Sequence, residues 1–127
     1  MKQLSIAAGL IFMVLMIVVA CDYGKSGGGT PTADSALMSP ASSTGRMDND
    51  EGVGHYRQGH WDVAEGHFRK AVKADPNLAE AHYNLGLSLD KEGKHEEATT
   101  AFKKAAGLAP TNPAIKDSAI LKKHIGM

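Results

Sequence analysis

The feature that most constrains the fold is a pattern that occurs twice, 34 residues apart. Six residues of one copy recur with the same identity in the other at this single offset. The matched pairs are Gly52 and Gly86, Gly59 and Gly93, Ala64 and Ala98, Phe68 and Phe102, Ala71 and Ala105, and Pro76 and Pro110. A repeat of this length is one supersecondary unit, and stacked units bury a continuous core. We therefore expect two stacked copies of one unit.

Each matched residue type has a physical role in a pair of packed helices. Gly86 and Ala98 are small where two helix backbones approach closely, and Phe102 fills the space between neighbouring hairpins. Gly93 lies where the first helix must end, at a position that favours a left-handed residue. Pro110 follows the second helix, which cannot continue through it. The pattern predicts two helical hairpins.

These residues resemble the tetratricopeptide-repeat family over about residues 46 to 112. The resemblance implies an all-α fold, a short solenoid of two helical hairpins followed by a capping helix. The expected domain covers residues 47–124, with the first repeat at about 46–78, the second at 79–112 and the capping helix at 113–124.

Periodicity and helix-end signals place the individual helices. We expect them near residues 48–58, 62–74, 78–92, 95–108 and 113–124. Glu96 and Glu97 fall in a first turn, and Asn112-Pro113 places proline at a first helical position. In the last helix, Ile115, Ala119 and Ile120 are expected to face the preceding hairpin.

Residues 1–20 give a second, independent indication. Lys2 precedes an almost wholly apolar run from Leu4 to Ala20, which ends at Cys21. This layout predicts a secretory signal peptide, because 17 apolar residues are short for a membrane span. The sequence Val18-Val19-Ala20-Cys21 resembles the bacterial lipoprotein processing box, which implies that Cys21 carries a lipid. The alternative is an uncleaved anchor helix, and both interpretations place the rest of the chain outside the cytoplasm.

The residues around this cysteine bear on localisation. Cys21 is the only cysteine in the chain, so no disulfide is expected. Asp22 resembles the residue that retains lipoproteins in the inner membrane of enteric-type Gram-negative bacteria. We expect an exported protein that is anchored to the cell membrane by its lipid and faces the periplasm or the exterior, with the inner membrane favoured.

Residues 21–46 are rich in Gly, Ser, Thr, Ala and Pro and contain few large apolar residues. Such a composition cannot bury enough surface to fold, which predicts a flexible tether. The whole chain has 14 basic and 14 acidic residues; without Lys2 the balance is 13 against 14, a net charge near −1. Nucleic acid is not expected as a partner, because phosphate binding needs a basic face.

In the tetratricopeptide-repeat family, the first helices of the repeats line a concave groove that holds a partner segment. The resemblance places eight residues there: Val53, Tyr56 and Arg57 from the first repeat, and Tyr83, Asn84, Leu87, Asp90 and Lys91 from the second. The amide of Asn84 suits a peptide backbone. Tyr83 has an alternative role in shielding the core, and Val53 in packing. A carboxylate clamp is not expected, because Asn49 and Val53 stand where the first repeat would need lysine and asparagine.

No catalytic, cofactor or metal-binding motif is evident. The six histidines show neither an HExxH spacing nor an i, i+4 pair, and no cysteine accompanies them in the predicted domain. The chain also has no CxxCH motif, Walker loop or GxSxG motif. The sequence therefore predicts a non-enzymatic protein with no cofactor and no metal ion.

The expected function is that of a lipid-anchored adaptor, which binds a protein or peptide and helps to assemble or localise an envelope complex. Two repeats and a cap fall below the three repeats that such solenoids usually need, so self-association into a homo-oligomer is the main alternative. Metal binding through the histidines is a third hypothesis.

Overall fold

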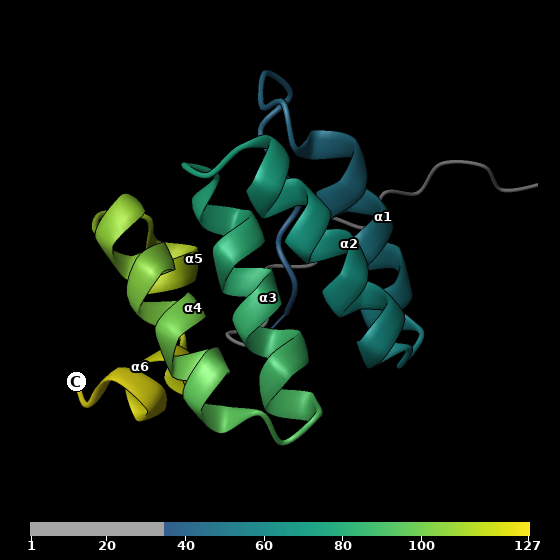
Figure 1. Cartoon of the computed structure of the whole chain (residues 1–127). Coiled ribbons are helices and arrows are strands. Elements are labelled where there is room, and N and C mark those ends of the chain that lie inside the picture. Colours follow the sequence, from purple (N-terminus) through teal and green to yellow (C-terminus); the bar gives the residue numbers. More distant parts are fainter. Residues whose placement is uncertain (1–34) are drawn as a thin grey trace, which may run out of the picture.

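The computed structural model describes residues 35–127; the expected signal peptide, Cys21 and the first part of the tether lie outside the described residues. Within the described part the chain forms helices and no strand, which confirms the all-α prediction (Figure 1). The helices are α1 (Arg46–Arg57), α2 (Trp61–Ala74), α3 (Ala79–Lys91), α4 (His95–Leu108), α5 (Pro113–Lys116) and α6 (Ala119–Ile125). None of them is both long enough and apolar enough to cross a membrane.

The first four helices form two hairpins, α1 with α2 and α3 with α4, and α2 packs against α3 where the hairpins meet (Figure 1). Gly59 and Gly93 close the two hairpin turns with φ angles of +82° and +78°. Residues other than glycine rarely adopt this left-handed backbone conformation, so glycine is required at both turns. These are the helix ends that the 34-residue pattern predicts.

Two further glycines allow the helices of each hairpin to approach closely. A Cβ atom on Gly52 would lie 2.6 Å from the ring of Phe68, and one on Gly86 would lie 2.7 Å from the ring of Phe102. Both phenylalanines are fully buried. Each phenylalanine ring therefore fills the space that the missing glycine side chain leaves, and the same packing is built twice.

The C-terminal cap differs from the prediction, since the expected helix 113–124 is two short helices. The Oδ1 atom of Asn112 accepts a hydrogen bond from the Ala114 N–H at 3.0 Å and starts α5. The Oγ atom of Ser118 accepts one from the Leu121 N–H at 3.3 Å and starts α6. A serine that caps a new helix favours a break before it, so one helix becomes two.

The break also changes which side chains of the cap are buried. Ile115 is buried as predicted, but Ala119 is exposed and Ile120 only half-buried. Leu121 takes their place in the core, with 1 % of its surface exposed. The phase of α6 is therefore set by its own cap and not by continuation of α5.

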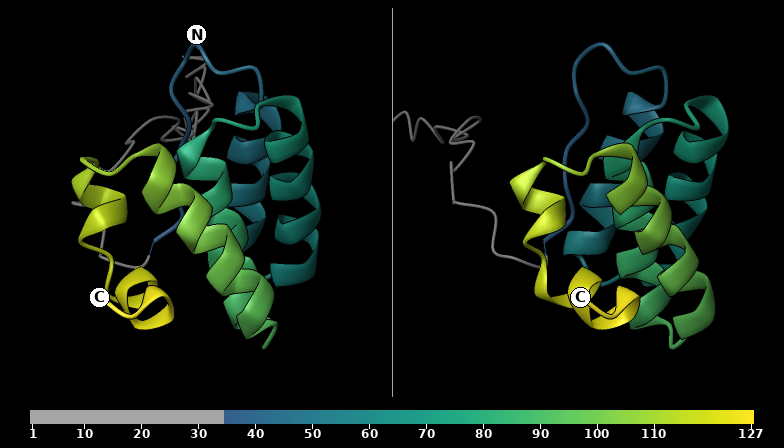
Figure 2. Two further views of the ribbon diagram at one scale, coloured as in Figure 1. Left: turned by 60° about the vertical axis from the view of Figure 1, so that its left-hand side comes forward. Right: turned by 90° about the vertical axis from the view of Figure 1, so that its left-hand side faces the viewer.

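The tether expected over residues 21–46 is also corrected in the part that the structure describes. Residues 35–39 run alongside α1 and α3 without forming a helix, and residues 40–45 form the loop that leads into α1 (Figure 2). Ala36 is 4 % exposed, and Leu37 packs half-buried against the core. At Gly45, directly before α1, a Cβ atom would lie 2.5 Å from the carbonyl oxygen of Ala71. We call residues 35–39 the docked segment.

Candidate functional site

The docked segment shows what the groove side of α1 and α3 can bind. The Oδ1 atom of Asn84 accepts a hydrogen bond from the Leu37 N–H at 2.7 Å, and its Nδ2 atom donates to the Leu37 carbonyl at 2.7 Å. One side-chain amide therefore binds both polar groups of one main-chain residue. Asn84 is fully buried, so these bonds are made away from solvent.

Asn49 on α1 completes this contact. Its Nδ2 atom donates to the Leu37 carbonyl at 2.9 Å, and its Oδ1 atom accepts a hydrogen bond from Asn84 at 2.8 Å. Asn49 is fully buried as well. Two asparagines from different repeats thus bond to each other and to the N–H and carbonyl of one residue, which joins α1, α3 and the docked segment in one network.

A third side chain extends the contact along the segment. The Oδ1 atom of Asp50 accepts a hydrogen bond from the Ser39 N–H at 3.0 Å. The side chain of Met38, between the two bound residues, is 52 % exposed. The groove therefore binds alternate residues of an extended chain through their main-chain groups. Ala36 is nearly buried, so a small side chain fits there.

Sequence reasoning missed Asn49 and Asp50 as binding residues, although an indication was present. Asp50 precedes Asn84 by 34 residues and so occupies the equivalent position of the first repeat. Asn49 is equivalent in the same way to Tyr83. Comparison of the groove positions at the repeat offset, and not only of the packing positions, would have found both.

Several of the predicted groove residues lie in the core. Tyr83 is fully buried and donates a hydrogen bond from its hydroxyl to Ser118 Oγ at 2.9 Å, so it fastens the C-terminal cap to α3. Val53 and Leu87 are each 1 % exposed. For these three residues the structure favours the packing role.

The other predicted groove residues lie at the C-terminal ends of the two groove helices. Tyr56 is 8 % exposed and its ring meets Trp61 edge-on at 4.9 Å. Arg57 and Lys91 are exposed, and Lys91 Nζ lies 5.8 Å from the centre of the Trp61 ring. Asp90 contacts two histidines and no residue of the docked segment. The predicted residues are thus divided between the peptide contact, the core and the helix ends.

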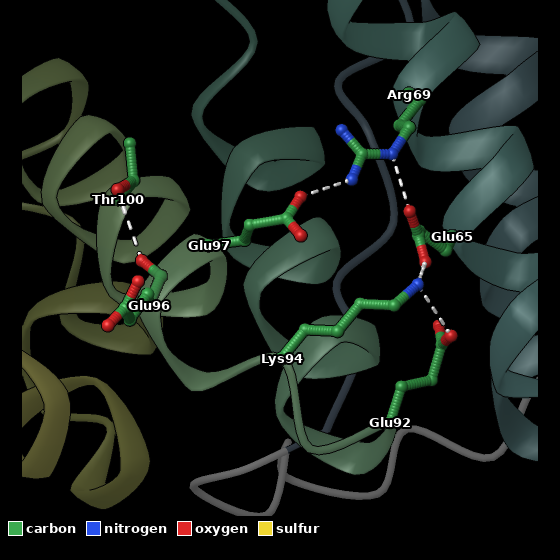
Figure 3. Close-up of polar contacts among 7 residues, drawn as sticks. All are labelled: Glu65, Arg69, Glu92, Lys94, Glu96, Glu97 and Thr100. Atoms are coloured by element: carbon green, nitrogen blue, oxygen red, sulfur yellow. Dashed lines mark hydrogen bonds and ion pairs between the residues drawn. The ribbon is translucent and has the colours of Figure 1, made fainter.

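A chain of ion pairs joins the two repeats (Figure 3). Lys94 Nζ lies 2.7 Å from Glu65 and 2.9 Å from Glu92, and Arg69 pairs with both Glu65 and Glu97. Burial opposes the charged form of Glu65, but the hydrogen bonds from Lys94 and Arg69 outweigh it and lower the pKa of this carboxyl from 4.5 to about 2. Glu65 is therefore held ionised between the hairpins.

An apolar hollow of about 370 Å³ lies between α2, α3 and α4. Val72, Leu85 and Leu89 are among its apolar lining, and Arg69 and Lys104 contribute positive charge. His82 also lines it; its ring contacts the Pro76 carbonyl at 2.8 Å, and burial lowers the pKa of the imidazole. The hollow shares no residue with the asparagine network, so it is separate from the groove.

Comparison with known proteins agrees with this architecture. The family model described as "Tetratricopeptide repeat" matches residues 49–113, which include both asparagines but neither the docked segment nor α6. A stretch of 56 residues is 38 % identical to part of protein O-mannosyl-transferase Tmtc2 of Drosophila melanogaster. That stretch is 43 % of this chain and 6 % of the fly protein, so the similarity covers only a small part of the larger protein. Since the family match covers half of the chain, the protein belongs to the tetratricopeptide-repeat family.

Proposed function

We propose that this protein binds an extended segment of a partner protein in the groove formed by α1 and α3. Tetratricopeptide repeats generally mediate protein–protein interaction. The observation that supports the groove is the contact of Asn84 and Asn49 with both main-chain polar groups of Leu37. A groove that binds one extended segment through its main chain has the chemistry to bind another.

The same contact makes the docked segment a competitor for the groove. A partner peptide that bonds to Asn84 must first displace Leu37, because the amide already uses its oxygen and its nitrogen there. Effective concentrations of tethered segments reach the millimolar range, so a partner must bind tightly or be abundant. We therefore propose that free protein holds its groove closed and that partner binding releases residues 35–39.

Lipid attachment at Cys21 is part of the proposal. Only 14 positions separate Cys21 from Ser35, a distance of at most about 50 Å when fully extended. With a lipid on Cys21, the groove would stay near the membrane surface and collect partners there. We propose an exported adaptor on the cell membrane, with inner-membrane retention favoured by Asp22, that helps to assemble or localise an envelope complex.

The proposed role is binding alone. The family is typically non-enzymatic, and the transferase named above is a far larger protein of which this chain resembles a small part. Main-chain recognition by buried asparagines needs neither a cofactor nor a reactive group.

In-cell photo-crosslinking tests the adaptor. A photo-reactive residue replaces Arg57 or Lys91, which are exposed at the ends of the groove helices, or Lys103 on α4 as a control. We expect one dominant foreign protein at the first two positions, loss of that product in the Asn84→Ala background, and no such product at Lys103. The same products at all three positions would contradict a groove-specific partner.

Self-association is the second candidate, because the groove demonstrably fits a segment of this same chain. The docked segment of one copy could bind the groove of another in place of its own. Light scattering over a hundredfold range of concentration distinguishes the two: mass that rises with concentration and falls back in Asn84→Ala favours exchange between copies. A constant monomer mass contradicts it.

A further inference from the structure

Three potential metal ligands converge at the C-terminal cap from three separate elements. Asp90 lies near the end of α3, His95 begins α4 and His124 lies in α6. The Oδ1 atom of Asp90 is 2.8 Å from His124 Nε2 and 3.1 Å from His95 Nδ1. All three ligand atoms lie within 4.8 Å of one another.

Thr99 determines which nitrogen of His124 carries a hydrogen. The Thr99 hydroxyl donates to the His95 carbonyl at 2.8 Å, so its hydrogen is already used. Its contact with His124 Nδ1 at 2.9 Å therefore needs an N–H on that nitrogen. A neutral imidazole then has a lone pair on Nε2, which points at the carboxylate of Asp90. Nε2 is therefore the nitrogen of His124 that can bind a metal ion beside the Asp90 carboxylate.

We propose that Asp90, His95 and His124 bind a divalent transition-metal ion of the Zn²⁺ class. Two imidazole nitrogens and one carboxylate oxygen are a common three-ligand set for zinc, with a fourth position for water. Bonds of about 2.0–2.2 Å to a common tetrahedral ion place ligand atoms about 3.3 Å apart. The two distances to Asp90 are close to that spacing, and the two imidazole nitrogens lie within 4.8 Å of each other.

The surroundings support the same assignment. The side chains of His124 and Asp90 are 8 % and 18 % exposed, whereas that of His95 is 67 % exposed. The site is therefore buried at His124 and Asp90 and open to solvent at His95, where an ion can enter. A metal-binding histidine usually donates its other N–H to an oriented acceptor, and Thr99 supplies that acceptor for His124.

A second group of potential ligands lacks these features. His67 lies 3.3 Å from Glu51 and 3.9 Å from Asp48, but it is the sole imidazole of that group, and the side chain of Glu51 is 63 % exposed. Oxygen-rich surface clusters hold transition metals less well than imidazole does. The proposal is therefore confined to the site at the cap.

A bound ion would fasten α6 to the α3–α4 hairpin. His124 also packs its ring against Phe102, with 5.1 Å between ring centres, so the ion would sit beside the core of the second repeat. This role is independent of the groove and adds an activity to the proposed adaptor.

The test uses the full chain purified in detergent, with its melting temperature measured in chelator and in ZnCl₂. At a hundredfold excess over the dissociation constant we expect a rise of at least about 5 °C. Mg²⁺, which prefers oxygen ligands, should give no rise. Co²⁺ should bind with a visible absorption band and one ion per chain.

Variants localise the effect. His95→Gln alters an exposed side chain, so it should fold normally and lose the zinc-dependent rise, while His60→Asn, an exposed histidine outside the site, should keep it. Thr99→Val should weaken zinc binding by about tenfold or more. No rise with zinc, or an equal rise in His95→Gln, would overturn the proposal.

Discussion

In α3, ten of the 13 residues are buried, whereas α1 buries four of its 12. Both helices occupy the same position in their repeats. The difference arises because α3 packs between the first hairpin and its own partner α4, and also contacts the docked segment and the cap, while α1 stands at the end of the solenoid. Position in the stack, and not the repeat pattern itself, decides how much of a first helix is buried.

The groove-side residues of the two repeats differ from each other, whereas the packing residues are the same in both. Asn84 and Asp50 are equivalent, and both bind main-chain groups of the docked segment. Tyr83 and Asn49 are also equivalent, but one binds the cap and the other the segment. The two repeats thus share the same helical packing but differ in the segments that their groove-side residues bind. The following variants test that division.

The largest loss should come from the two phenylalanines. Phe102→Ala should lower the free energy of unfolding by about 3–5 kcal/mol, enough to unfold much of a domain this small. Phe68→Ala should cost less, because Phe102 also borders Tyr83 and His124, at 5.7 and 5.1 Å between ring centres. Urea unfolding followed by circular dichroism measures both. A greater loss at Phe68 would contradict the central role assigned to the second repeat.

Glycine-to-alanine changes separate packing from helix propensity. In Gly86→Ala the new Cβ meets the Phe102 ring at 2.7 Å, so we expect a loss of about 1–3 kcal/mol. Gly54→Ala in α1 has no atom within 4 Å of its Cβ and should gain about 0.5–1 kcal/mol, since alanine favours a helix. Thermal unfolding shows whether each variant is more or less stable than the original protein. A loss of stability in Gly54→Ala would show that α1 is packed closely at this position.

Removal of the central amide should release the docked segment. Asn84→Ala leaves the Leu37 N–H without its acceptor, at a cost of about 1–3 kcal/mol if the segment stays in place. We expect the segment to leave, so hydrogen exchange at the Leu37 amide should speed up at least tenfold while the core amides of α4 stay protected. Asp50→Ala, whose bond to Ser39 is part-exposed, should have a smaller effect. Equal exchange rates at the Leu37 amide in Asn84→Ala and Asp50→Ala would contradict the central role of Asn84.

The smallest loss of stability should come from the ion pairs between the repeats. The pKa of Glu65 is lowered to about 2 in the folded protein, so its contribution is complete above the unfolded value of 4.5 and is lost as the pH falls towards 2. Glu65→Gln should cost about 1 kcal/mol at pH 7 and flatten the fall in stability between pH 4.5 and 2. Chemical unfolding at each pH measures the free energy of unfolding of both proteins. The same dependence of stability on pH in both would contradict a contribution from the ion pairs of Glu65.

The 34-residue pattern was sufficient to predict the hairpins, because its residues act through local packing. Gly59, Gly93, Phe68 and Phe102 do what their types imply, and the first four helices begin and end within two residues of the predicted bounds. The break at Ser118 was missed because a cap bond there competes with continuation of a helix that looks regular in sequence.

The candidate sites were harder to predict, for a different reason. The hydrogen bonds that hold Leu37 are made to its main chain, which every residue has, so the residue type does not reveal them. Asp90, His95 and His124 come from three elements, and a search for spacings within one helix cannot find them. Tyr83 matched a groove position, but the cap that covers it depends on the break at Ser118.

The docked segment lies on the only stretch of chain between Cys21 and the helices. If Cys21 is fixed in a membrane, any tension between membrane and domain is transmitted through residues 35–39 and loads their hydrogen bonds to Asn84, Asn49 and Asp50. Pulling and peptide binding would then act on the same bonds. With Cys21 fixed in this way, pulling would open the groove mechanically and make it accessible to another segment.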